Sequence, residues 1–292
     1  MTLLRVKVSR HSAFYSPVIG AMAAGFLREE GIEAEYSVLQ PGERSHELIR
    51  AGAVDIMQSA VSSNWKPMEA GIADLPVHFA QINRRDGFFL VARKPEPGFQ
   101  WVGLQGKTLL ADHGLQPLVM LQFAARWNGL DWGEIRAADA GTPEEMAAAF
   151  RAGQGDYVHL QGPAAQQLEH EGGGHVVVSV GAAMPPVAFS SLCASRAFLE
   201  TETARAFVRA YRRSRAWARE TSAREVARVE QAFFPGIHEA ALTAAIERYQ
   251  QLGCWDQDIA IPRDLYDQAL AVFRDHLTRA HAYEDVVTPP PE

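Results

Sequence analysis

The chain has 292 residues, of which 47% are hydrophobic and 22% are charged, and its net charge is −7. This composition is that of an ordinary globular protein and argues against disorder. The acidic balance excludes a nucleic-acid-binding footprint, which needs clustered Lys and Arg, so we expect no nucleic-acid partner.

The first part of the chain alternates strand-like and helix-like segments. Residues 3–8 alternate apolar and polar side chains, which is typical of a strand, and Pro17 suits the first position of the next helix. Strands that alternate with helices predict parallel pairing through right-handed crossovers, and therefore an open α/β lobe. The expected strands are 3–8, 33–39, 54–58 and 77–82, and the expected helices are 16–30, 45–51 and 62–70.

The alternation restarts after an apolar strand at 88–92, which precedes a Pro-rich surface turn. A helix at 142–152 has a strong start signal, because Thr142 suits a cap and Pro143 suits the first helical position. We therefore expect a second α/β lobe, followed by a helical region. Its expected strands are 108–111, 135–138, 157–160 and 176–180, its helices 117–127, 142–152 and 163–170, and the later helices 203–220, 223–233, 237–252 and 263–279.

One phrase occurs in both halves of the chain, as R-A-G-A-V-D at 50–55 and as R-A-G-Q-G-D at 151–156. Each Gly suits a left-handed cap at a helix end, and each Asp leads into a strand. Either copy alone is an ordinary sequence for the turn between a helix and a strand. Because the flanking elements also match, we predict two similar lobes that face each other across a cleft.

The loops predicted to line this cleft follow the strands, because ligands of open α/β sheets bind beyond the carboxyl ends of the strands. Their hydroxyl, amide, imidazole and aromatic groups suit a small polar or aromatic ligand, and helix N-termini favour an anionic one. The candidate ligand-binding residues are His11, Ser12, Phe14, Tyr15, Gln40, Ser59, Ser62, Asn64, Arg84, Asp112, His113, Gln116, His159 and Gln161.

Several of these candidates also have a purely structural interpretation. Phe14 and Tyr15 could stack on a flat ligand or pack the first helix onto the sheet. Asp112 could pair with a cationic ligand group, although a helix cap is slightly favoured. Arg84 and Arg85 could pair with a carboxylate, sulfonate or phosphate, with one of the two pointing to water.

The three cleft histidines, His11, His113 and His159, are the best candidates for acid–base chemistry or metal binding. Their spacings match no metal motif, so we expect polar contacts, with no metal and no cofactor. Cys193 and Cys254 stand far apart beside apolar neighbours, which favours buried structural thiols.

The compartment stays open at this point. No apolar run approaches the roughly 18 residues of a membrane span, so we expect no membrane insertion. The N-terminal residues predict a strand and not a secretory signal. The protein is therefore expected to be periplasmic if a leader has been removed, and cytoplasmic otherwise.

Five segments together resemble a known family: S-R-H-S-A-F-Y-S-P, L-I-R-A-G-A-V-D-I-M-Q-S-A, A-Q-I-N-R-R-D-G-F-F-L-V-A-R, L-Q-G-K-T-L-L-A-D and A-I-E-R-Y-Q-Q-L-G-C-W. The chain resembles the type II periplasmic binding-protein fold. More narrowly, it resembles the nitrate/sulfonate/taurine-type substrate-binding proteins and their thiamine-pyrimidine-precursor-binding (NMT1/THI5-like) relatives. The resemblance implies a two-lobe, Venus-flytrap α/β fold, in which each lobe is a mixed, mostly parallel sheet flanked by helices.

The resemblance also implies the domain plan and the role. Lobe one would comprise residues 1–87 with 196–292, and lobe two residues 88–195, with crossovers near 83–88 and 185–191. The protein would be a monomeric solute-binding protein that captures a sulfonate, a pyrimidine or an aromatic carboxylate. Its partner would be an ABC permease.

Enzymes among the relatives supply the alternative hypothesis. Thiamine-pyrimidine synthases carry a cofactor-bearing Lys close after the third strand, where this chain has Ser59, with Lys66 further on. Desulfinase relatives carry a nucleophilic Cys in the loop after the first strand, where this chain has S-R-H-S-A-F-Y. We therefore expect no enzyme. The alternative is a cytosolic pyrimidine synthase, desulfinase or decarboxylase-like enzyme that uses the cleft histidines, and a third hypothesis is a ligand sensor.

Overall fold

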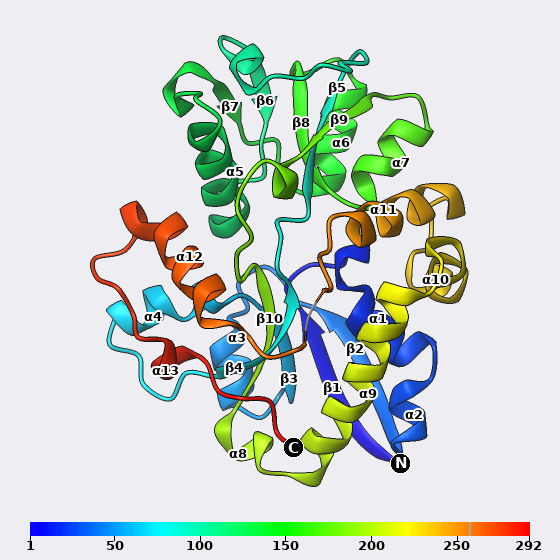
Figure 1. Cartoon of the computed structure of the whole chain (residues 1–292), viewed down its shortest axis with the longest axis vertical. Helices are drawn as coiled ribbons and strands as arrows, with labels where there is room; N and C mark the ends of the chain where they lie inside the picture. The colour runs from blue at the N-terminus through cyan, green and yellow to red at the C-terminus, as the bar shows by residue number, and fades with distance from the viewer. Residues whose placement is uncertain (257) are drawn as a thin grey trace.

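The protein is described by a computed structural model that covers residues 1–256 and 258–292. Two five-stranded sheets form two lobes, one above the other in Figure 1. The first sheet has the order β2-β1-β3-β10-β4, and the second has the order β7-β6-β8-β5-β9. In the first sheet β1 is parallel to β2 and β3, and β10 runs antiparallel to β3 and β4. The predicted two-lobe α/β fold with mixed sheets is confirmed.

The strands lie close to their predicted positions. Those of the first lobe are β1 (Thr2–Val8), β2 (Ile32–Val38), β3 (Ile56–Ser59), β4 (Val77–Asn83) and β10 (Ser190–Ala194). Those of the second lobe are β5 (Phe88–Ala92), β6 (Thr108–Leu110), β7 (Arg136–Ala138), β8 (Tyr157–Gln161) and β9 (His175–Ser179).

Helices cover both faces of each sheet (Figure 1). The first lobe has α1 (Ser16–Ala23), α2 (Phe26–Glu29), α3 (Ser45–Arg50), α4 (Trp65–Glu69), α8 (Arg196–Leu199), α9 (Glu202–Glu220), α10 (Ala223–Glu230), α11 (Glu239–Gln251), α12 (Arg263–Phe273) and α13 (Tyr283–Val286). The second lobe has α5 (Leu115–Trp127), α6 (Pro143–Arg151) and α7 (Ala164–His170). Short 3₁₀ turns include η1 (Ala13–Tyr15), η2 (Val61–Ser63), η3 (Trp101–Leu104), η5 (Val180–Ala182) and η6 (Gln231–Phe233).

Two expectations about the elements are wrong. The helix expected at 16–30 is divided into α1 and α2, because Gly25 takes a left-handed conformation with φ of +86° and interrupts the helix. The lobe boundary expected at 195 falls too late, because β10 is hydrogen-bonded between β3 and β4 of the first sheet. The second lobe therefore ends before Ser190, in the crossover that leads to β10.

The repeated R-A-G-x-x-D phrase makes the same contacts in both lobes. The glycine of each copy is left-handed, with φ of +66° and +93°, which confirms the predicted caps. The Asp55 N–H donates to the carbonyl of Arg5 at 3.0 Å, and its carboxylate accepts the Arg5 N–H at 2.8 Å. Asp156 makes the same pair of bonds with Thr108, at 2.7 and 2.8 Å. Each Asp therefore extends a parallel ladder of its lobe, between β1 and β3 in the first lobe and between β6 and β8 in the second.

Two crossovers and one helix connect the lobes. The crossovers run from β4 to β5 and from η5 to β10, and the helix α11 packs against α7 of the second lobe as well as η1 of the first. The phenol of Tyr249 on α11 donates to the carbonyl of Gly87 at 2.9 Å and accepts the N–H of Gly162 at 2.8 Å. α11 therefore forms a third, non-covalent link between the lobes.

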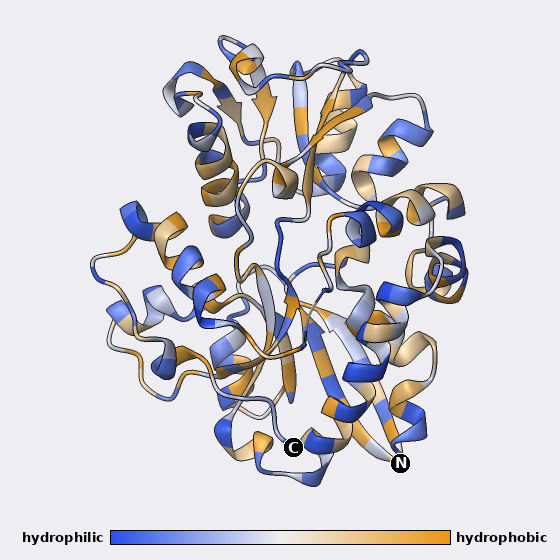
Figure 2. Cartoon of the chain, viewed as in Figure 1, coloured by the Kyte–Doolittle hydropathy of each residue, from blue (hydrophilic) through white to orange (hydrophobic). Residues whose placement is uncertain are grey.

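The apolar core runs through both lobes as one contiguous cluster. In Figure 2 the strands β5 and β9 of the second sheet are mainly hydrophobic, whereas β1 of the first sheet and α9 alternate hydrophobic and hydrophilic residues. Within the residues described, each helix is too short or too polar to cross a lipid bilayer.

Candidate ligand-binding cleft

A cleft of about 410 Å³ lies between the two lobes, where the carboxyl ends of β1, β2 and β3 face the loops that follow β6 and β8. This is the edge at which open α/β sheets bind their ligands. Both lobes and both crossovers contribute to its surface. Its lining residues are Ser9, Arg10, Tyr15, Leu39, Gln58, Ser59, Ala60, Ser62, Ser63, Phe88, Gly114, Leu115, Gln116, Pro117, Gln161 and Phe189.

Three aromatic rings form the inner wall of the cleft. Tyr15 is carried by η1, Phe88 begins β5, and Phe189 precedes β10. Each is buried, with at most 3% of its surface exposed. Burial raises the pKa of the Tyr15 phenol, so this ring stays neutral at physiological pH. The wall is therefore uncharged and aromatic, and only a small part of each ring is exposed in this conformation.

Three amide side chains supply the polar groups of the cleft. The Gln58 carbonyl accepts the N–H and the hydroxyl of Ser9, at 2.9 and 2.8 Å, which fixes its orientation. The Gln116 amide donates to the carbonyl of Phe189 at 2.7 Å and so joins the two lobes. The carbonyl of Gln161 has no hydrogen-bond partner in the described part of the chain. An amide oxygen that is buried and unpaired is available to a ligand donor.

Arg10 is the only cationic side chain among the described lining residues. Its guanidinium lies 2.6 Å from the carboxylate of Asp112, which belongs to the opposite lobe. The same guanidinium lies 5.4 Å from the centre of the Phe88 ring. The second oxygen of Asp112 accepts the N–H of Gly114 at 2.8 Å. The single cation of the cleft is thus already paired with a carboxylate, and Asp112 forms an ion pair and a turn in place of the expected helix cap.

The predicted site residues divide into two groups. The structure places Tyr15, Ser59, Ser62, Gln116 and Gln161 on the cleft surface. Other predicted residues make contacts away from the cleft surface. Three of them donate hydrogen bonds to main-chain carbonyls: Ser12 to Gly162, Gln40 to Val38 and Asn64 to Pro76. Phe14 packs against Phe189 and Tyr249, and Asp112 contacts the cleft only through Arg10.

None of the three predicted cleft histidines is among the lining residues of the cleft. Both ring nitrogens of His11 are used inside the first lobe, at 2.7 Å from the Tyr36 hydroxyl and 2.7 Å from the carbonyl of Phe233. Burial lowers the pKa of His11, so this ring is neutral at physiological pH. His113 bonds to the carbonyl of Ala111 at 2.8 Å and is otherwise exposed. Neither is placed to act on a ligand.

His159 lies one layer beneath the cleft surface. It is fully buried, and its ring stacks on the ring of Phe88 with 4.4 Å between centres. Burial lowers its pKa to about 3, an effect that the Asp112 carboxylate only partly opposes. In this structure Phe88 lines the cleft and His159 packs behind it, so His159 is not a lining residue.

The arginines of the first crossover are not among the cleft-lining residues. The main-chain N–H of Arg84 donates to the carbonyl of Cys254, and the main-chain carbonyl of Arg84 accepts the N–H of Val187 in the second crossover. The Arg85 guanidinium donates to the carbonyl of Gly181 at 3.3 Å. These bonds hold the two crossovers side by side.

Sequence reasoning missed four residues that shape the cleft: Arg10, Gln58, Phe88 and Phe189. Arg10 and Gln58 lie where β1 and β3 end, so their position after a strand was an available signal. Phe88 and Phe189 lie in the crossovers, where an apolar residue in the sequence does not reveal that it borders a cleft.

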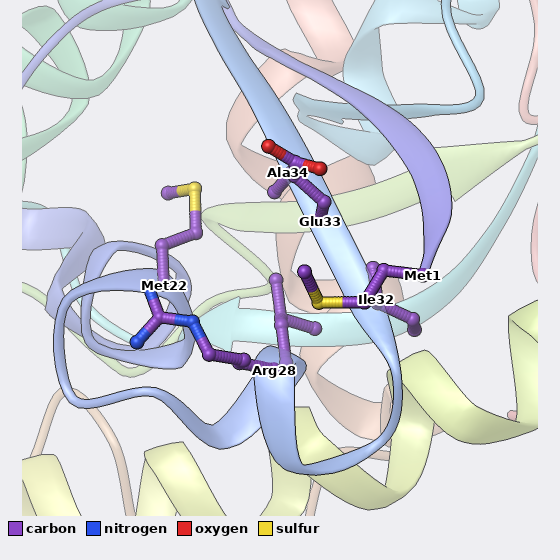
Figure 3. Close-up of a pocket in the computed structure, with 7 residues that line it drawn as sticks. Met1, Met22, Arg28, Ile32, Glu33 and Ala34 are labelled. Carbon is purple, nitrogen blue, oxygen red and sulfur yellow. The ribbon is translucent and has the colours of Figure 1, made fainter.

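A second hollow lies at the opposite edge of the first sheet, where β1 and β2 begin (Figure 3). It holds about 310 Å³. Only the first lobe forms it, so lobe closure cannot change its shape. Its lining residues are Met1, Met22, Leu27, Arg28, Ile32, Glu33 and Ala34. We therefore place the functional site in the interlobe cleft.

Neither cysteine is placed for nucleophilic chemistry. Cys193 and Cys254 are fully buried and do not line the cleft. Burial raises the pKa of the Cys193 thiol to about 12 and also raises that of Cys254, which keeps both thiols protonated. The expectation of buried thiols is confirmed. In the described residues, no group of three or more His, Cys, Asp and Glu side chains could hold a metal ion.

Comparison with known proteins identifies the family. A sequence model described as NMT1/THI5 like matches residues 13–224. YtlA of Bacillus subtilis (strain 168), a candidate binding protein by its name, is 28% identical over 263 residues, which cover 88% of this chain and 79% of YtlA.

Solved structures show the same fold at low sequence identity. The ligand binding component of an ABC-type import system from Staphylococcus aureus has a TM-score of 0.77 at 14% identity, covering 99% of this chain and 97% of that one. The aliphatic sulphonate binding protein SsuA from Escherichia coli has a TM-score of 0.74 at 15% identity, covering 99% and 93%. The desulfurization enzyme DSZB has a TM-score of 0.68 at 15% identity, covering 99% and 97%. The structures establish the fold, and because the sequence model matches most of its length, the chain belongs to the NMT1/THI5 like family.

Proposed function

We propose that this protein is the solute-binding component of an ABC-type import system and holds a small, flat organic ligand between its lobes. The observation that carries the proposal is the composition of one cleft. An aromatic wall, three amides and one arginine meet there, and both lobes contribute them. Family membership and the fold shared with an ABC import component support the same role.

The cleft chemistry limits the ligand class. The rings of Tyr15, Phe88 and Phe189 favour a planar aromatic or heteroaromatic ring. The amides can pair with donors and acceptors at the edge of that ring. Because Arg10 is the one cation among the described lining residues, the ligand carries at most one anionic group. Aromatic carboxylates, aromatic sulfonates and pyrimidines satisfy these conditions.

Lobe closure provides the mechanism of capture. Residues of the first lobe, such as Leu39, face residues of the second, such as Leu115, across the cleft mouth. Leu115 is 52% exposed, so a closing movement would bury it against the ligand. The crossovers that precede β5 and β10 are the segments that can absorb a hinge rotation. A permease would then distinguish the closed, loaded form from the open one.

A ligand screen tests the proposal. Benzoate, benzenesulfonate and cytosine represent the three classes, and each would be titrated against the protein by thermal shift and calorimetry. A ligand that binds only the folded state raises the melting temperature in a concentration-dependent way. We expect this for at least one class, together with a one-to-one calorimetric isotherm and no chemical change of the ligand. No shift at saturating concentration of all three classes contradicts the proposal.

A further inference from the structure

Four ionisable side chains form a cluster around Phe88, which lines the cleft. The Asp86 carboxylate accepts the Phe88 N–H at 2.7 Å, the His159 ring stacks on it, and the Arg10 guanidinium lies over it. Asp112 joins the group through its 2.6 Å ion pair with Arg10. Arg10 follows β1 of the first lobe, Asp112 and His159 belong to β6 and β8 of the second or the loops after them, and Asp86 lies in the first crossover. The cluster therefore lies where the lobes meet.

This cluster is buried but incompletely hydrogen-bonded. Asp86 and His159 are fully buried, and Asp112 is 5% exposed. In the part of the chain that the structure describes, one oxygen of Asp86 and both nitrogens of His159 have no hydrogen-bond partner. Buried polar atoms are nearly always paired, so unpaired ones concentrated in one place require an explanation. The unpaired oxygen of Asp86 is one of these atoms, and it can accept a proton.

The charges of the cluster leave no free cation for an anionic ligand. Arg10 is neutralised by Asp112, and Asp86 adds a second carboxyl nearby. An anion that binds Arg10 therefore enters beside two carboxyl groups in a region of low dielectric constant, where like charges repel strongly. Protonation of one carboxyl removes that repulsion without breaking the fold.

We propose that an anionic ligand binds in this cleft together with one proton, which passes from solvent to the carboxyl of Asp86. The inference rests on the proposed function, since it concerns the same cleft. Asp86 is the natural acceptor because burial, with a smaller contribution from the neighbouring Asp112, raises its pKa to about 7 even though the Phe88 N–H lowers it. A bound anion raises that pKa again, so the complex holds a proton that the free protein has lost.

The groups that face Asp86 have different roles in this exchange. The Phe88 N–H opposes protonation of Asp86, and the Asp112 carboxylate favours it. His159 is neutral, because burial lowers its pKa to about 3. The ionisable groups around Asp86, taken over all elements packed against it, are Arg10, Tyr15, Arg85, Asp112, His159 and Cys254.

The sign of the pH dependence follows from this assignment. Below pH 7 the Asp86 carboxyl of the free protein is already protonated, so affinity for an anion is high and constant. Above pH 7 the free protein loses the proton, and affinity falls by up to about tenfold per pH unit. A neutral ligand of the same shape has the same affinity throughout.

Calorimetry in two buffers tests the inference. Benzoate and its neutral isostere benzamide would be titrated at pH 7.5 in phosphate and in Tris, whose ionisation enthalpies differ. The difference in apparent enthalpy gives the number of protons taken up. We expect between about half a proton and one proton for benzoate and none for benzamide. Benzenesulfonate replaces benzoate if only the sulfonate binds.

Two variants locate the proton. Asp86→Asn should bind benzoate without proton uptake, whereas Glu230→Gln should keep the uptake. Glu230 is the matched control, because it is also a fully buried carboxyl with a raised pKa but contacts Ser16 and not the cleft. Benzoate that binds the wild type without proton uptake overturns the inference and leaves the proposed function standing. If Asp86→Asn takes up as many protons as the wild type, the assignment to Asp86 is overturned. If no anionic probe binds, both the anionic ligand class and this inference are overturned.

Discussion

The guanidinium of Arg10 lies between a carboxylate and an aromatic ring, and both belong to the opposite lobe. A guanidinium nitrogen lies 2.6 Å from the Asp112 carboxylate, and the guanidinium carbon lies 5.4 Å from the centre of the Phe88 ring. Its side chain is 26% exposed, so it still faces the cleft. Arg10 therefore both lines the cleft and makes a contact between the two lobes.

Replacement of this cation should weaken the binding of an anionic ligand. Arg10→Gln removes a charged hydrogen bond of about 2 kcal/mol, so the dissociation constant of benzoate should rise roughly 30-fold in calorimetry. Arg44→Gln is the control, because Arg44 is exposed and pairs only with Glu47 at the surface. Because Arg10→Gln leaves Asp112 unpaired, the double variant Arg10→Gln/Asp112→Asn should recover part of the lost stability. Unchanged benzoate affinity in Arg10→Gln would exclude this arginine as the anion anchor.

Close packing at the first crossover depends on Gly87. A Cβ atom at this position would lie 2.7 Å from three carbon atoms of the Phe14 ring. Phe14 is fully buried and cannot move aside, so Gly87→Ala should lower the free energy of unfolding by about 1–3 kcal/mol. Gly98→Ala should leave it unchanged, since nothing lies within 4 Å of its Cβ. Denaturant titration of the two variants measures the difference, and equal stability would refute the packing argument.

At the scale of elements, the same helix–turn–strand unit occurs in both lobes. The carboxylates of Asp55 and Asp156 accept the N–H groups of Arg5 and Thr108 at the same distance of 2.8 Å. Each glycine before them is left-handed, which lets the helix end and the chain turn into the strand. The two units therefore do the same structural work at matching places in the two sheets.

Matching units should respond alike to the same change. Gly52→Ala and Gly153→Ala each force a side chain into the left-handed region, which costs roughly 1–2 kcal/mol. Nothing lies within 4 Å of either Cβ position, so sterics add nothing to this cost. Gly103→Ala, with open space and no left-handed backbone, is the control. Urea denaturation should show similar losses in the two variants, and a loss in only one would show that the units are not equivalent.

The sequence predicts elements well where their signals are local. Thr142 caps the start of α6 as expected, and Glu145 completes a reciprocal cap with it. The exception at 16–30 arises because helical periodicity continues across Gly25, while the backbone there turns left-handed. Strand β10 was placed in the wrong lobe, because its pairing with β3 and β4 depends on how the second crossover returns to the first sheet.

For the site, the sequence predicts which loops form it but not the contacts between residues of different lobes. Tyr15, Ser59 and Gln161 were expected from the ends of strands, and they do lie on the cleft. The pairing of Arg10 with Asp112 joins residues from different lobes, so no local pattern reveals it. In the same way, His159 follows a strand pattern in the sequence, but the ring of Phe88 covers it.

At the scale of the whole molecule, the two lobes should approach each other when a ligand binds. Leu39→Cys with Leu115→Cys places one thiol on each side of the cleft mouth. A bound ligand that closes the lobes should raise the rate of disulfide formation severalfold, as followed by non-reducing electrophoresis. The native cysteines are buried with raised thiol pKa values and should not interfere.

The control pair is Leu3→Cys with Val102→Cys. Both residues are exposed, one in each lobe and both outside the cleft lining, so their cross-linking should not depend on ligand. Equal ligand effects on the two pairs would show a general change in thiol reactivity and argue against closure.

Buried histidines should make the fold sensitive to acid. Burial lowers the pKa of His78 to about 3, whereas the unfolded chain has a value near 6.5. Between these values the unfolded state binds more protons, so stability falls as pH falls, by up to about 1.4 kcal/mol per pH unit. His78→Asn should lose less stability between pH 6 and pH 4 in urea titrations. The exposed His113→Asn should follow the wild type, and parallel pH profiles for all three proteins would contradict the assignment.

The order of elements along the chain has a consequence for biosynthesis. The second lobe is one continuous segment, but the first sheet remains incomplete until β10 has been made. Tyr249, which joins Gly87 to Gly162, is made later still. During translation, the second lobe can therefore fold as it emerges from the ribosome. The first sheet, in contrast, cannot join β3 to β4 until β10 has been made. The cleft of the nascent protein is therefore completed only after α11 has been made, when Tyr249 can bond to Gly87 in the crossover and to Gly162 in the loop.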